Sequence, residues 1–129
     1  MNEIFYNCLM EYIKVNNEGP REIILIKNGS TKYDNSMKIN VEVEEIKTVL
    51  KSSKDTMNSK LMYVLLDKDT NQKFFSQRGN DVVNPSSGLL VNSHAVSQDF
   101  EFYLVAQQCN RGTVKPTFYK VVYNNSSME

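Results

Sequence analysis

Two short apolar runs restrict the possible folds of this chain more than any other feature. Residues 22–27 and 61–66 each have strand length and do not alternate with polar residues, which is typical of strands covered on both faces of a sheet. The segment 40–53 between them is predicted to be a helix, because Glu42 and Glu44 lie in its first turns and lysines follow toward its end, an order that suits the helix dipole. Strand, helix and strand predict a right-handed crossover with parallel strands, and hence an α/β fold.

The flanking segments extend this pattern. Residues 2–15 carry apolar side chains at helical spacing, and Gly19 and Pro20 are expected to end that helix. Shorter strands are expected at about residues 89–92, 100–107 and 118–123. Ligands of parallel sheets bind beyond the C-terminal ends of the strands, so residues 27–29 and 67–69 should face any binding site.

Composition narrows the class of protein. The 129 residues suffice for one domain, residues 1–129. Fifteen Lys and Arg balance fifteen Asp and Glu, so any contact with nucleic acid must be local. Cys8 and Cys109 lack the spacing of a zinc site, and a reducing compartment, the cytoplasm or the nucleus, is the simpler interpretation. No stretch approaches the roughly 18 apolar residues of a membrane span, so we expect no membrane attachment.

A series of segments resembles, in order, the motifs of one protein family. In the second half these are Asn71–Gln77 ("NTRFFAQ"), Asn84–Gly88 ("NPxPGT"), Phe100–Gln107 ("YDFFIVSQ"), Gly112–Tyr119 ("GSVSPTHY") and Val121–Asn125 ("VIYDN"). Upstream, Ile23–Gly29 resembles "RIIVYRDG", and Val41–Val43 lies where the family has "NYEVPQ". These motifs are those of the PIWI domain, the RNase H-like module of Argonaute and Piwi proteins.

The resemblance covers residues 1 to about 125 and is closer to the Piwi branch than to the Argonaute branch, chiefly through Asn71 and Phe74–Gln77. It implies an RNase H-like mixed sheet flanked by helices, the C-terminal portion of a PIWI domain. The first strands of the family's sheet would precede Met1, so the strand at Ile23–Ile26 is expected to form an apolar edge. Such an edge predicts a homodimer, pairing with a partner protein, or poor solubility.

The resemblance also implies that nuclease chemistry is lost. The family's slicers use two Mg²⁺ ions, which need converging anionic oxygen ligands. Two of the family's four ligands would precede Met1, the third falls on Asn28, and the fourth falls on Phe118, which cannot bind a metal. We therefore expect no catalysis, no metal site and no cofactor. The simpler interpretations are that Asn28 is a turn residue beside Gly29 and that Phe118 is a packed strand residue.

Contacts with an RNA backbone are the function that the resemblance leaves open. The family holds nucleic acid mostly through phosphates and sugars, and the residues here that match or adjoin such segments are Lys73, Arg78, Arg111, Thr113, Lys115 and Tyr119. Taken singly, each is more simply a solvent-facing residue, whereas the loop 111–115 as a whole favours nucleic-acid contact. His94, the only histidine, is more simply a surface residue than a base. Asp67 and Asp69, which bracket Lys68, are more simply a solvated loop than a cation site.

The sequence thus predicts a catalytically inactive PIWI-like module that keeps binding to guide or target RNA backbone in small-RNA silencing. One alternative is a protein-interaction or regulatory fragment that binds no RNA. A truncated product without a function of its own also remains open.

Overall fold

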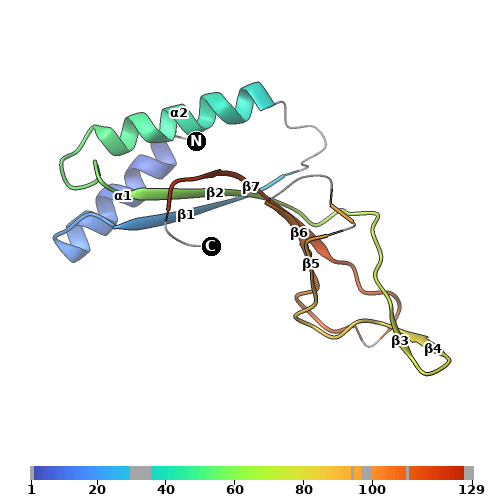
Figure 1. Cartoon of the computed structure of the whole chain (residues 1–129). Coiled ribbons are helices and arrows are strands. Elements are labelled where there is room, and N and C mark those ends of the chain that lie inside the picture. Colours follow the sequence, from blue (N-terminus) through green and yellow to red (C-terminus); the bar gives the residue numbers. More distant parts are fainter. Residues whose placement is uncertain (1, 30–35, 94, 97–99, 110, 127–129) are drawn as a thin grey trace. The chain divides into compact units, whose positions relative to one another are not determined.

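The computed structural model describes residues 2–29, 36–93, 95–96, 100–109 and 111–126, and Figure 1 shows the order of their elements. The helices are α1 (Asn2–Asn16) and α2 (Ser36–Lys51). The strands are β1 (Glu22–Asn28), β2 (Lys60–Asp67), β3 (Ser76–Arg78), β4 (Asp81–Val83), β5 (Leu90–Val91), β6 (Glu101–Leu104) and β7 (Thr117–Asn124). Five of these strands form one sheet in the order β1-β2-β7-β6-β5, and β3 and β4 form a separate hairpin.

The first two strands of the sheet run parallel. At their beginning, the Lys60 amide donates to the Arg21 carbonyl at 2.8 Å, and at their end the Gly29 amide donates to the Leu66 carbonyl at 3.0 Å. Residue numbers therefore rise in the same direction along both strands, as they do in a parallel pair. Because α2 lies between these strands in sequence, the predicted strand-helix-strand crossover is confirmed.

The remaining strands are antiparallel and make the sheet mixed. The Asn125 amide donates to the carbonyl of Leu61, and Thr70 Oγ1, just after β2, donates to the carbonyl of Pro116, just before β7. The end of one strand thus meets the beginning of the other. β7 also pairs antiparallel with β6, and β6 with β5. The predicted mixed sheet with helices is confirmed.

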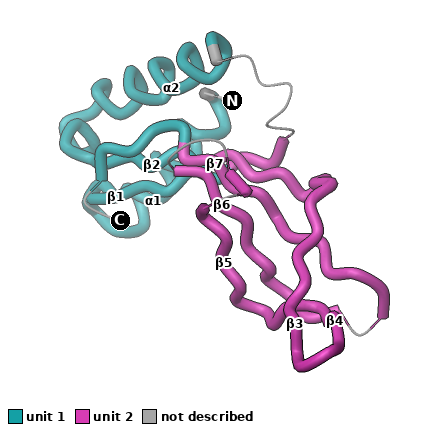
Figure 2. The backbone as a smooth tube through the Cα atoms, turned by 45° about the vertical axis from the view of Figure 1, so that its right-hand side comes forward, with its two compact units in different colours: residues 1–26, 33–64, 122–129 teal, residues 27–32, 65–121 magenta. Residues whose placement is uncertain are grey.

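The chain divides into two compact units, shown in teal and magenta in Figure 2. Unit 1 comprises residues 1–26, 33–64 and 122–129, and unit 2 comprises residues 27–32 and 65–121. The expectation of one domain over residues 1–129 stays a prediction. In unit 1 the buried apolar side chains come from both helices and from β2, namely Leu9, Val43, Ile46, Leu50, Leu61, Tyr63 and Val64.

Polar groups buried in unit 1 have hydrogen-bond partners. Thr56 is completely buried, and its hydroxyl donates to the carbonyl of Leu50 at 2.7 Å. The Tyr63 ring is also completely buried, while its hydroxyl donates to Glu42 Oε2 at 2.5 Å. Since an unpaired buried polar group costs about 1–3 kcal/mol, these bonds allow an apolar core to include both residues.

The helices begin and end for local reasons. α1 ends at Asn16, and the next residue, Asn17, forms a left-handed cap with a φ of 56° and an amide bond to the Ile13 carbonyl. The predicted helix is confirmed, but its cap is Asn17 rather than Gly19. α2 begins at Ser36, four residues before the predicted start, and has no acidic residue in its first turn. The expected placement of Glu42 and Glu44 in the first turns was therefore wrong.

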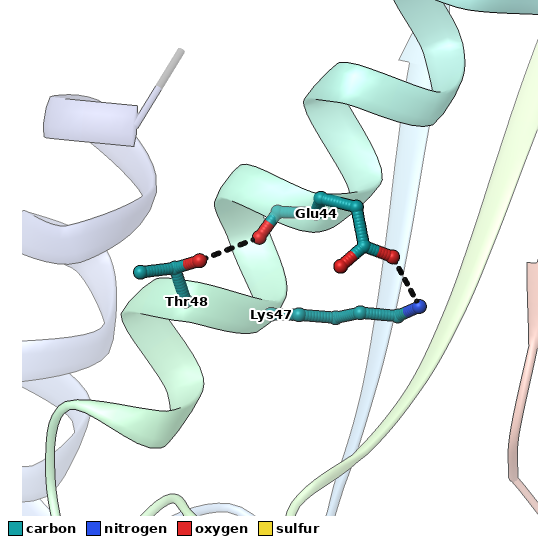
Figure 3. Close-up of polar contacts among 3 residues, drawn as sticks. All are labelled: Glu44, Lys47 and Thr48. Carbon is teal, nitrogen blue, oxygen red and sulfur yellow. Dashed lines mark hydrogen bonds and ion pairs between the residues drawn. The ribbon is translucent and has the colours of Figure 1, made fainter.

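Within α2, side chains three and four residues apart interact, as helical geometry allows. Lys47 Nζ lies 2.8 Å from Glu44 Oε1, and Thr48 Oγ1 donates to the Glu44 carbonyl at 2.8 Å (Figure 3). The lysine holds the pKa of the Glu44 carboxyl below its ordinary value through a hydrogen bond and its charge. The same hydrogen bond raises the pKa of Lys47.

β1 differs from its prediction although its position is correct. Its residues alternate between exposed and half-buried, and Ile24 and Ile26 are 53% and 55% exposed. The expectation that this strand is covered on both faces was wrong. β1 stands at the end of the sheet order, so the expected apolar edge is confirmed, whereas β2 lies between two strands and is mostly buried.

The hairpin of β3 and β4 was not expected from the sequence. Arg78 pairs with Asp81, so Gly79 and Asn80 form a two-residue loop. Gly79 has a φ of 60°, which a type II′ turn requires at its first central position. A Gly-Asn pair between two strand-like segments is a hairpin signal and could have identified this element.

Candidate nucleic-acid interface

The C-terminal end of β2 and the N-terminal end of β7 lie side by side in unit 2. The hydrogen bond from Thr70 to the Pro116 carbonyl joins the two segments. Lys68 follows directly after β2, and Lys115 lies two residues before β7. The antiparallel arrangement thus places both lysines at the same end of these strands. Residues 67–69 were expected to face any binding site, and they lie where β2 ends.

A pocket of about 580 Å³ opens at these strand ends, and we call it the basic pocket. It is lined by Lys68, Ala106, Gln107, Gln108, Cys109, Thr113, Val114, Lys115, Thr117 and Tyr119. Its volume falls in the range of about 300–1,000 Å³ typical of small-molecule sites. No acidic residue stands among these lining residues, while Lys68 and Lys115 supply two exposed ammonium groups. The pocket is therefore suited to an anionic group.

One side chain holds the loop that carries Thr113. Asn84 Nδ2 donates to the Gly112 carbonyl at 2.7 Å, and the Val114 amide donates to Asn84 Oδ1 at 3.2 Å. Gly112 has a φ of 82°, a conformation that costs glycine little. The two ends of one amide therefore fix the loop on both sides of Thr113.

The aromatic residues of β6 and β7 lie on two opposite faces of the sheet. Phe102 pairs with Tyr119, and Tyr103 with Phe118. The rings of Phe102 and Tyr119 are stacked, with centroids 4.9 Å apart and planes 8° from parallel. Because successive side chains of a strand point to opposite faces, Phe118 points away from the face that carries Tyr119.

The face that carries Phe118 is filled by aromatic and charged neighbours. Tyr103 contacts the rings of Phe118 and Phe74 at 4.9 and 5.4 Å. Glu101, 6% exposed, bonds Lys120 at 3.0 Å. Burial, and then the negative charges of Glu101 and Asp67, raise the pKa of the Tyr103 hydroxyl. The interpretation of Phe118 as a packed strand residue is confirmed.

A second, smaller pocket adjoins the basic pocket. It has a volume of about 260 Å³, includes Arg78 of β3, and shares Gln108 and Cys109 with the basic pocket. We call it the hairpin pocket. Neither Cys109 nor Cys8 is in a disulfide.

Four of the six predicted binding residues line a pocket, and two do not. Thr113, Lys115 and Tyr119 line the basic pocket, and Arg78 lines the hairpin pocket. Lys73 and Arg111 are exposed but line neither pocket. The Arg111 carbonyl accepts a hydrogen bond from the Cys109 thiol, which places its backbone next to a lining residue.

The structure differs from the sequence predictions at two residues near the site, Lys68 and Asp67. Lys68 was not among the predicted binding residues, although its place at a strand end was the signal that could have found it. Asp67 was interpreted as part of a solvated loop, but it is 6% exposed and accepts the Asp69 amide at 2.9 Å. It ends a buried strand, so that interpretation was wrong. His94 lies outside the described residues.

Neither of the two residues expected at metal-ligand positions of the family supplies an anionic oxygen for Mg²⁺. Asn28 is exposed and is the last residue of β1 rather than a turn residue, and its amide oxygen carries no charge. The Phe118 ring offers no ligand atom and packs against Tyr103. Among the residues with described positions, no group of three or more His, Cys, Asp or Glu could hold a metal ion. In the same part of the chain, neither helix is long and apolar enough to cross a membrane.

Curated relatives match almost the whole chain. It is 30% identical over 123 residues to "Piwi-like protein 1" of Gallus gallus, covering 95% of this chain and 14% of that protein. It is 31% identical over 123 residues to "Protein argonaute 9" of Arabidopsis thaliana, covering 94% of this chain and 14% of that protein. The chain therefore spans about one seventh of these relatives, and the two identities do not separate the Piwi branch from the Argonaute branch.

Solved structures and the family match agree. Drosophila Piwi superposes with a TM-score of 0.84 and 26% identity, covering 98% of this chain and 18% of that one. Kluyveromyces polysporus Argonaute, solved with a guide RNA, gives a TM-score of 0.77 and 20% identity over 98% of this chain and 17% of that one. The fold is therefore RNase H-like, as expected. Residues 1–129 match the Piwi domain, and the chain belongs to this family.

Proposed function

We propose that this chain is a catalytically inactive Piwi module that binds the backbone of a guide or target RNA in small-RNA silencing. The observation that carries the proposal is the basic pocket, where Lys68, Lys115 and Thr113 come together on a face without acidic lining residues. Lysine ammonium groups and threonine hydroxyls are donors that bind phosphate oxygens. The Argonaute of K. polysporus was solved with a guide RNA, which supports the choice of ligand.

The local nature of the positive charge fits this mode of binding. The whole chain has a net charge of zero, so long-range attraction to nucleic acid is weak. Binding then depends on a few cations at one place, and it should be modest and sensitive to salt. We propose that it occurs in the cytoplasm or the nucleus and requires no cofactor.

The absence of cleavage is part of the proposal. Asn28 and Phe118 replace the anionic and imidazole ligands that the family uses, and the Phe118 ring packs against aromatic neighbours. We expect the purified chain to leave a guide-paired RNA intact in Mg²⁺. Guide-directed cleavage lost in Asn28→Ala would contradict this.

Fluorescence anisotropy with a short labelled single-stranded RNA tests the binding. The double variant Lys68→Ala/Lys115→Ala should lower the affinity at least about tenfold and reduce the slope of log affinity against log salt by roughly 1.4, because two phosphate contacts are removed. The matched control is Lys54→Ala/Lys60→Ala, which removes two exposed lysines from unit 1. Equal effects of the two double variants would reject the pocket as the binding site.

The exposed edge of β1 favours a second candidate, a protein-interaction fragment. Ile24 and Ile26 are more than half exposed on the terminal strand of the sheet, and such an edge can pair with another strand. Pairing with a partner protein or a second copy is the expected consequence. Size-exclusion chromatography that gives a stable monomer at all concentrations would reject self-pairing.

A further inference from the structure

The Tyr119 ring combines two properties that phosphate binding alone does not need. Tyr119 lines the basic pocket together with Lys68 and Lys115, and its ring is stacked on that of Phe102. A hydroxyl that only bonds phosphate needs no such stack. The stacked partner instead fixes the plane of the Tyr119 ring.

We propose that the basic pocket takes an unpaired nucleotide whose base stacks on Tyr119, while Lys68 and Lys115 hold its backbone. This rests on the proposed RNA binding and defines its ligand as a single strand with accessible bases. Proteins that bind single strands without sequence preference pair a cationic groove with aromatic rings in this way.

The geometry of the pair supports an aromatic platform. Phe102 covers one face of the Tyr119 ring, with planes 8° from parallel, so the surface that Tyr119 contributes to the pocket is its other face, its edge or its hydroxyl. The cross-strand pairing of these residues fixes the ring on a sheet rather than on a loop, which lowers the entropic cost of stacking a base against it.

The neighbouring residues are consistent with this role. Thr117 lines the pocket and lies on the same face of β7 as Tyr119, two residues away. Its side chain is small and leaves room beside the ring. The pocket volume of about 580 Å³ falls in the range of sites that bind molecules as large as a nucleotide.

The test compares short single-stranded RNA with an abasic strand of the same length and phosphate count. Wild-type protein should bind the RNA about fivefold or more tightly than the abasic strand, which is the effect of one stacked base. Tyr119→Phe keeps the ring and should keep this ratio, while Tyr119→Leu should bring the ratio close to one, because only the ring stacks on the base. Tyr12→Leu, an exposed tyrosine of α1, is the control and should keep the wild-type ratio.

The outcomes separate this inference from the proposed function. Equal binding of the RNA and the abasic strand by wild-type protein overturns the stacking and leaves backbone binding in place. A ratio that falls in Tyr119→Phe as far as in Tyr119→Leu also overturns it, because the hydroxyl would then be responsible. Failure to bind either strand overturns both proposals. Should Tyr119→Leu not fold by circular dichroism, the wild-type ratio and Tyr119→Phe still decide.

Discussion

The two compact units bury different kinds of residues. In unit 1 the buried residues are aliphatic side chains, Tyr63 and Thr56. Unit 2 buries two carboxylates, Asp67 and Glu101, besides Leu65, Pro85, Val105, Val114 and Pro116. The basic pocket and the hairpin pocket are lined entirely by residues of unit 2. Burial of charge requires partners and lowers stability unless they are well placed. We infer that unit 1 stabilises the fold and unit 2 carries the binding chemistry.

The largest expected effect is a core deletion in unit 1. Ile46 is completely buried, so Ile46→Ala should lower the free energy of unfolding by about 2–5 kcal/mol. Val82 in the hairpin of unit 2 is 70% exposed, so Val82→Ala should change the free energy of unfolding by less than about 0.5 kcal/mol. Urea denaturation measures the free energy of unfolding of both variants. Similar losses in the two would contradict the inference that the apolar core of unit 1 stabilises the fold.

Two glycines should differ in the cause of their effect. A Cβ on Gly19 would lie 1.8 Å from the Asp55 carbonyl oxygen, so Gly19→Ala should cost about 1–3 kcal/mol of stability by overpacking unit 1. Gly88 in unit 2 has open space around it but a φ of 89°, so Gly88→Ala should cost about 1 kcal/mol through backbone strain. Thermal unfolding followed by circular dichroism compares them. A larger loss for Gly88→Ala would contradict the expectation that packing limits unit 1.

Two asparagines provide a matched test of structure against function. Asn125 Oδ1 accepts the Leu61 amide at 2.6 Å in unit 1, and Asn84 holds the loop at Thr113 in unit 2. At about 1 kcal/mol of net stability per hydrogen bond, Asn125→Ala should cost about 1 kcal/mol and Asn84→Ala, which loses two bonds, about 2 kcal/mol. Only Asn84→Ala should also weaken RNA binding, measured by anisotropy, because its loop lines the pocket. Equal RNA affinity of the two variants would contradict the positioning role of Asn84.

The smallest effects should appear at the extremes of pH. The lowered pKa of Glu44 contributes stability that is present above its ordinary value of 4.5 and is lost as the pH falls through the lowered pKa. The raised pKa of Tyr103 contributes stability that is present below its ordinary value of 10.0 and is lost as the pH rises through the raised pKa.

Melting temperatures across the pH range check these signs. Glu44→Gln should flatten the acid limb of the stability profile, and Tyr103→Phe should flatten the alkaline limb. The first effect should be slight, because Glu44 is exposed and water screens its ion pair. A change of the opposite limb in either variant would show that the assignment to Glu44 or Tyr103 is wrong.

The sequence could predict what depends on near neighbours in the chain. Apolar runs and helical spacing report local periodicity, so α1, β2, the crossover and the strands near residues 90, 101 and 117 were all expected. The Gly79-Asn80 pair between β3 and β4 is a local signal of the same kind, although no hairpin was predicted there. The Piwi family was identified from the order of short motifs, each of which alone was weak.

Burial and the pocket could not be predicted in the same way. β1 and β2 have similar apolar sequences, yet β1 is half exposed because it stands at the end of the sheet and β2 lies between two strands. The local sequence of a strand does not show which other strands will lie beside it, so the exposure of its side chains cannot be predicted from it.

The sequence by itself determined the fold class and the family, and it shows that Asn28 carries no anionic oxygen and Phe118 no ligand atom, because these follow from residue identity and local pattern. Only the tertiary structure decided that Lys68 joins Thr113 and Tyr119 at one pocket and that Phe118 points to the other face. The physical reason is that sheet pairing joins segments far apart in the chain, and the alternation of side chains then decides which of them share a face.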